Sequence, residues 1–110
     1  EIPSPLLYDG LIYMVRNGGL LVAVDATNGK LLHRERLNAP GQYSASPVAA
    51  NDHIYLSSNR GVITTVKVDK EFRITHQHDL NDPVFVTPAI DKNTLYVRTE
   101  KALWAFRTND

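Results

Sequence analysis

The sequence contains no cysteine, so disulfide bonds, thiolate zinc sites and cysteine nucleophiles are excluded. An excess of charge is also lacking, because twelve basic residues balance twelve acidic ones, and no run of like charges stands out. Nucleic acids and anionic lipids are bound mainly through clustered positive charge, so neither is expected as a partner. No apolar stretch approaches the roughly 18 residues of a membrane-spanning helix, and no membrane span is expected.

A signal peptide and an initiating methionine are absent as well, since the chain starts at Glu1. We interpret the chain as a processed product or an excised fragment. Its 110 residues suffice for one ordinary domain, and we expect residues 1–110 to form a single one.

The sequence does contain an internal repeat. The segments "SPLLYDGLIYMV", "SPVAANDHIYLS" and "TPAIDKNTLYVR" begin at residues 4, 46 and 87. Downstream of them follow "GGLLVAV" (18–24), "RGVITTV" (60–66) and "EKALWAF" (100–106). Three copies in register at intervals of 42 and 41 residues indicate a repeat architecture.

Each copy consists of short segments rich in β-branched and aromatic residues, bounded by glycine, asparagine and aspartate, which is typical of strands. No window has sustained 3.6-residue periodicity, so essentially no helix is expected. The expected strands cover residues 5–8, 11–15, 20–25, 30–37, 47–50, 53–57, 62–68, 73–80, 88–90, 94–98 and 102–107.

Four-stranded sheets that repeat about every 40 residues predict the blades of a β-propeller. The expected fold class is therefore all-β, a β-propeller fragment of about two and three-quarter four-stranded antiparallel blades. The first blade covers residues 4–37, the second 46–80, and a partial third, without a fourth strand, 87–107.

The stretch "AVDATNGKLLH" (23–33) resembles the docking motif A-x-D-x-x-x-G-x-x-x-W of the pyrroloquinoline-quinone-like (PQQ-like) β-propeller repeat. Ala23, Asp25 and Gly29 match the motif, and His33 stands where it has tryptophan. Nearly the whole chain resembles these repeats, particularly the last blades of bacterial propellers such as outer-membrane-assembly lipoproteins. This resemblance implies that the motif locks one blade against the next and that the protein is extracytoplasmic.

The resemblance does not extend to a cofactor. Quinone-using dehydrogenases of this superfamily need a calcium site and often a vicinal disulfide, whereas this chain has no cysteine and no acidic cluster at ligand spacing. No cofactor is therefore expected. The second copy also departs from the docking motif, with Thr65, Lys67 and Ile74 in the equivalent places.

Two of the four histidines form an H-x-H pair, His76 and His78. Because residues i and i+2 of a strand share a face, both imidazoles could meet one metal ion, with Asp79 or His33 as a third ligand. The alternative is an exposed outermost strand that tolerates polar residues. We favour that alternative and expect no metal site.

Other chemistry-bearing residues are expected to pack. On the strand 30–37 we place His33 on the same face as Leu31, flanked by apolar residues. Trp104 and Phe106 should share one side of the last strand and fill the space between blades. No G-x-S-x-G, P-loop or H-E-x-x-H motif is present, so no catalytic residue is predicted.

An incomplete ring leaves apolar faces and a strand edge uncovered, and such edges recruit partners. We therefore expect the chain to be the C-terminal part of a larger propeller, and to self-associate as a dimer or trimer when alone. The favoured function is a non-enzymatic scaffold for protein contacts. The alternative is the non-catalytic part of an extracytoplasmic quinoprotein-like or sugar-active enzyme whose active site lies in other blades.

Contacts with a partner would start from the loops 38–45 and 81–86, which connect successive blades. Tyr43 and Phe85 are the candidate exposed aromatic residues there. Both could instead pack between blades.

Overall fold

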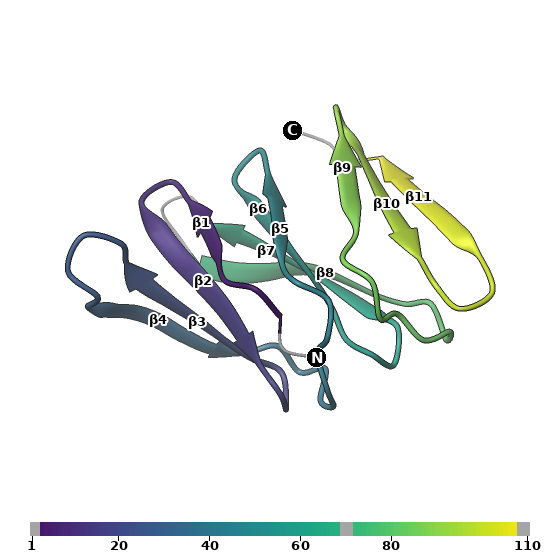
Figure 1. Ribbon diagram of the computed structural model, residues 1–110, viewed down its shortest axis with the longest axis horizontal. Helices are drawn as coiled ribbons and strands as arrows, with labels where there is room; N and C mark the ends of the chain where they lie inside the picture. Colours follow the sequence, from purple (N-terminus) through teal and green to yellow (C-terminus); the bar gives the residue numbers. More distant parts are fainter. Residues whose placement is uncertain (1–2, 69–71, 108–110) are drawn as a thin grey trace.

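The computed structural model describes residues 3–68 and 72–107. Within these residues the structure has strands and no helix. The strands form three antiparallel sheets, here called blades (Figure 1). Blade 1 contains β1 (Leu6–Tyr8), β2 (Leu11–Arg16), β3 (Leu20–Asp25) and β4 (Leu31–Arg36). Blade 2 contains β5 (Val48–Ala50), β6 (His53–Ser57), β7 (Val62–Val68) and β8 (Phe72–Asp79). Blade 3 contains β9 (Ala89–Asp91), β10 (Thr94–Arg98) and β11 (Leu103–Arg107).

The predicted all-β propeller fragment is confirmed, and no end of an observed strand differs from the expected one by more than one residue. Each blade begins just after one of the prolines Pro5, Pro47 and Pro88, since proline has no N–H to donate to a ladder. In every sheet the spatial order of the strands is their order along the chain.

The three blades stand side by side like the ribs of a fan, with β4 and β11 at opposite ends in Figure 1. The first strands of the blades are neighbours, because β1 lies beside β5 and β5 beside β9. One apolar core fills the joint between blades 1 and 2, and a second fills the joint between blades 2 and 3. The central strands β6 and β7 of blade 2 are therefore buried on both faces, which explains why they are mostly apolar without strict alternation.

The connections between blades cross two glycines that are repeat equivalents. Leu37 N–H donates to the Gly19 carbonyl at 2.8 Å, and Leu80 N–H donates to the Gly61 carbonyl at 2.9 Å. A Cβ atom at Gly19 would lie 2.7 Å from the carbonyl oxygen of Ala39, and one at Gly61 would meet the backbone of the following connection even more closely. Only glycine allows these connections to pass so near the third strand of each blade.

A row of hydrogen bonds links the starts of the three blades. The Ser4 N–H donates to Ser46 Oγ at 2.8 Å, and the Ser46 N–H donates to Thr87 Oγ1 at 2.9 Å. The serine before the proline of blade 1 and of blade 2 thus binds the start of the next blade. Their place in the repeat is visible in the sequence, but these hydrogen bonds are not.

A β-bulge in the outermost hairpin of each complete blade corrects two expectations. In blade 1, His33 pairs with Ala23 but Leu31 pairs with Val24, so these two side chains lie on opposite faces rather than on one. In blade 2, His76 pairs with Thr65, as His33 does with Ala23. The residue equivalent to His33 is therefore His76 and not Ile74, which the sequence comparison assigned to that place.

Candidate interaction site at the joints between blades

The joint between blades 1 and 2 is closed by an aromatic ring from β8. The ring of Phe72 lies 4.5 Å from the imidazole of His33, nearly parallel at 10°, and 6.5 Å from the ring of Tyr13 at 8°. Ala23, opposite both His33 and Tyr13 in the sheet, is completely buried. Phe72 therefore occupies a slot whose floor is a small residue and whose walls are two rings, an arrangement that stacking stabilises.

The turn that precedes His33 is organised by Asp25. Its Oδ1 accepts hydrogen bonds from the Thr27 hydroxyl at 2.6 Å and from the Thr27 N–H at 2.8 Å. The hydrogen bond from the Thr27 hydroxyl is the main reason why the pKa of the Asp25 carboxyl lies below its usual value. Gly29 closes the turn with φ of 73° and donates its N–H to the Asp25 carbonyl. The turn fixes where β4, and hence His33, begins.

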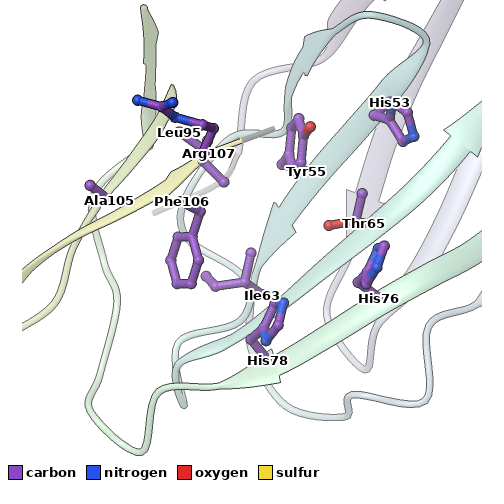
Figure 2. Close-up of a pocket in the computed structure, with 10 residues that line it drawn as sticks. All are labelled: His53, Tyr55, Ile63, Thr65, His76, His78, Leu95, Ala105, Phe106 and Arg107. Atoms are coloured by element: carbon purple, nitrogen blue, oxygen red, sulfur yellow. The ribbon is translucent and has the colours of Figure 1, made fainter. Parts of the chain in front are cut away.

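The joint between blades 2 and 3 contains a cavity of about 350 Å³ (Figure 2). Blade 2 contributes most of the lining, and blade 3 contributes the opposite wall through β10 and β11. The lining residues are His53, Tyr55, Ile63, Thr65, His76, His78, Leu95, Ala105, Phe106 and Arg107. None of these ten described residues is acidic, so the charged and titratable groups at the cavity are three imidazoles, one phenol and one guanidinium.

A row of stacked rings runs along one side of this joint. His76 lies 6.2 Å from His78, His78 lies 5.5 Å from Phe106, and Phe106 lies 6.3 Å from Trp104. His76 and His78 do share a strand face, as do Trp104 and Phe106. Asp79 and His33 do not join the histidine pair, because no group of three histidine, aspartate or glutamate side chains in the described part of the chain could hold a metal ion.

The two loop aromatics fall in different environments. Tyr43 is only 1% exposed and donates its hydroxyl to the Ala39 carbonyl at 2.6 Å, and burial raises its pKa to about 12. Of the two alternatives for Tyr43, an exposed contact residue and packing between blades, the structure has the second. Counted back from the next blade's proline, Tyr43 corresponds to Val84, and both fill the core of a joint. Phe85, one residue later, is 52% exposed.

The second connection is anchored to the last hairpin by Asp82. Its carboxylate accepts the Lys101 N–H at 2.9 Å, and the Glu100 N–H donates to the Pro83 carbonyl at 2.9 Å. A hydrogen bond from the Thr99 side chain is the main cause that lowers the pKa of the Asp82 carboxyl. The hydrogen bond from the Lys101 N–H lowers this pKa further. Asp82 was not predicted from the sequence. Its only distinguishing feature there is its position two residues after Leu80, the repeat equivalent of Leu37.

The sheet order, the stacked rings in the joint between blades 1 and 2 and the bulged outer hairpins define a class of protein, a PQQ-like β-propeller module. The chain belongs to the family described as outer membrane protein assembly factor BamB, whose model matches residues 1–109. No helix in residues 3–68 and 72–107 has the length and hydropathy needed to cross a membrane.

Two relatives show how similar this chain is to known proteins and how much of their length it covers. Outer membrane protein assembly factor BamB of Moranella endobia (strain PCIT) is 29% identical over 100 residues, which are 84% of this chain and 24% of that protein. The crystal structure of BamB from Moraxella catarrhalis superposes with a TM-score of 0.75 at 16% identity, covering 94% of this chain and 32% of that one. The chain thus spans about a quarter to a third of the length of these relatives.

Proposed function

We propose that this chain is a non-enzymatic scaffold module, the C-terminal part of a larger propeller whose end faces receive further blades or protein partners. The observation that carries the proposal is the pair of uncovered faces at the two ends of the fan. Leu7 (67% exposed) and Leu31 (53%) lie on the side of blade 1 that faces away from blade 2. Leu103 (70%) and Tyr96 (38%) lie on the outer side of blade 3.

Both end faces have the composition of the joints that are already filled. Side chains of this kind in the two internal joints are buried against a neighbouring blade, so the exposed sets fit a surface that another blade or protein covers. Residues 4–37, 46–80 and 87–107 are in this proposal the blades of a single partial propeller domain. An extracytoplasmic location is supported by the family description, an outer membrane assembly factor.

The docking motif has a defined role in the same proposal. Ala23 gives the neighbouring blade room, Asp25 and Gly29 shape the turn, and His33 packs flat against blade 2 in place of tryptophan. The stack of His33 on Phe72 supports this role.

Light scattering tests the scaffold proposal. At micromolar concentration the 110-residue chain should form a dimer or trimer, and Leu103→Glu should shift it to monomer because a charge cannot be buried in an apolar face without a partner. Val86→Glu is the matched control, since Val86 is 58% exposed but lies in a connection between blades. A sharp monomer with a cooperative melt would contradict the proposal.

A further inference from the structure

The cavity between blades 2 and 3 lies at the place where the first joint holds an aromatic ring. In the first joint, Phe72 lies between the rings of Tyr13 and His33. The repeat equivalents of these two rings are Tyr55 and His76, and both line the cavity of the second joint (Figure 2). The cavity therefore contains a slot of the kind that receives a flat ring between two others.

The size of the cavity suits a small molecule with one ring. Its volume of about 350 Å³ is at the lower end of ligand pockets, which measure roughly 300–1,000 Å³. An apolar cavity of about 150 Å³ is enough for benzene. The inner wall is made by the buried residues Tyr55, Ile63 and Leu95. His76 and His78 on β8 are exposed, so a ligand can enter from their side.

The second joint has hydrogen-bonding side chains where the first joint has apolar ones. His53 takes the place of Leu11, and Thr65 takes the place of Ala23. None of the ten described lining residues is acidic, and the guanidinium of Arg107 extends away from the three imidazoles in Figure 2. A cation would therefore find no negative side chain among these residues, and a neutral or weakly acidic ligand fits better.

Hydrogen bonds fix which imidazole nitrogens can accept. His53 Nδ1 lies 2.8 Å from the Asn51 carbonyl oxygen, which can only accept, so Nδ1 carries the proton and the neutral ring has its lone pair at Nε2. The Thr75 hydroxyl donates to the Thr65 carbonyl at 3.3 Å, so its oxygen accepts the His76 Nδ1–H at 3.2 Å. Each of these two imidazoles thus offers Nε2 to a hydrogen-bond donor.

We propose that this cavity is a binding site for a small phenol, a molecule with one flat ring and one weakly acidic hydroxyl. The ring stacks between Tyr55 and His76, as Phe72 stacks in the first joint, and the hydroxyl donates to Nε2 of His53. His76 is not the acceptor, because it turns its face to the ligand and its lone pair lies in the plane of its own ring. This site is separate from the scaffold function and does not depend on self-association.

Two isomers separate the contribution of the ring from that of the hydroxyl. The probe is para-ethylphenol, whereas para-methylanisole has the same atoms but no hydroxyl proton to donate. Both are titrated into the 110-residue chain at concentrations below those at which light scattering detects association. NMR follows the imidazole resonances of His53 and His76, with His33 of the first joint as an internal reference. Saturable shifts are expected at His53 and His76 but not at His33.

The affinities should follow the chemistry of the lining. The dissociation constant of para-ethylphenol should be about 1 mM or lower. Para-methylanisole should bind severalfold more weakly, because it leaves the acceptor of His53 without a donor. Phenethylamine, a cation of similar size, should bind at least about tenfold more weakly, since burying its charge without a negative partner is unfavourable.

Two variants act on different parts of the site. His53→Leu gives the second joint the residue that blade 1 has at Leu11, and it should make the affinities of the two isomers equal. His76→Ala removes one wall and should weaken both isomers by the same factor, so that the preference for the phenol remains. Glu35→Ala, at the place in blade 1 that corresponds to His78, is the matched control and should change neither affinity.

Absence of saturable shifts, or equal affinities of the parent chain for the two isomers, overturns the phenol site, and this comparison needs no variant to fold. A preference for the phenol that survives in His53→Leu overturns the assignment of the acceptor. A self-associating chain that ignores para-ethylphenol overturns only the phenol site. A strictly monomeric chain that binds it overturns only the self-association.

Discussion

At the residue scale, His33 shows how a substitution in a repeat motif is accommodated. An imidazole is smaller than an indole, yet it lies flat on Phe72 with ring centres 4.5 Å apart. The partner ring comes from β8, whose first residue was expected one position later along the chain. The contact was therefore not predictable from the motif alone, although a packing role for His33 was inferred from the repeat.

Two substitutions of His33 should change the stability of the first joint in opposite directions. His33→Trp extends the stacked area on Phe72 and should raise the melting temperature, whereas His33→Ala removes the stack and should cost about 1 kcal/mol. Thermal melts followed by circular dichroism measure both. Glu35→Ala on the same strand is the control, and a lower melting temperature for His33→Trp would contradict the docking role.

The carboxyl of Asp25 predicts a pH dependence. Its pKa is lower in the folded chain than in the unfolded chain, so its contribution to stability is fully present above about pH 4 and is lost as the pH falls through the folded pKa. Asp25→Asn should lower the melting temperature near neutral pH and reduce its fall between about pH 5 and pH 3. Equal pH profiles for Asp25→Asn and the parent chain would show that the Thr27 hydrogen bonds do not contribute.

At the element scale, strand positions were predictable because short β-branched segments and turn residues recur in three copies. The register of the outer hairpins was not. A bulge adds one unpaired residue without any local sequence signal, and the β7–β8 hairpin is one residue longer than the β3–β4 hairpin. The assignment of Ile74 to the place of His33 was therefore wrong, and only the pairing with Thr65 identifies His76. The same lack of signal left the burial of Tyr43 undecided, because its loop has no regular period.

The connections over Gly19 and Gly61 make a further prediction at this scale. Gly61→Ala places a methyl group against the backbone of the connection at Asp82, at a φ of 101°. This should cost about 3 kcal/mol or more, since backbone cannot move aside as a side chain can. Gly29→Ala is the control, because its φ of 73° is also positive but nothing lies within 4 Å, so its cost should be about 1 kcal/mol. Urea unfolding measures both, and equal losses would mean that the close approach does not matter.

At the scale of the whole molecule, stability should be graded from blade 2 outwards. Strands β6 and β7 are buried on both faces, whereas β4 and β11 are mostly exposed. The fan architecture was predictable from the repeat length. Which residues fill each joint was not predictable, because the second joint lacks an aromatic ring equivalent to Phe72 of the first joint.

Hydrogen exchange measures this gradient directly. Amides in β7 should exchange at least about tenfold more slowly than those in β11, because β7 is hydrogen-bonded on both sides within a buried sheet. Uniform protection across β7 and β11 would contradict the gradient and would indicate that another strand already covers the edge of β11.

The row of hydrogen bonds at the starts of the blades has a polarity. Ser4 donates to Ser46 and Ser46 donates to Thr87, so one end of the row offers an acceptor hydroxyl and the other end an N–H. An isologous contact that pairs two identical ends cannot extend such a row, and copies that continue it must join head to tail. Head-to-tail joining has two geometric outcomes: the rotation between copies closes a ring, or it generates a filament that keeps growing. The angle of rotation from one blade to the next therefore decides whether the copies form a soluble ring or a fibre.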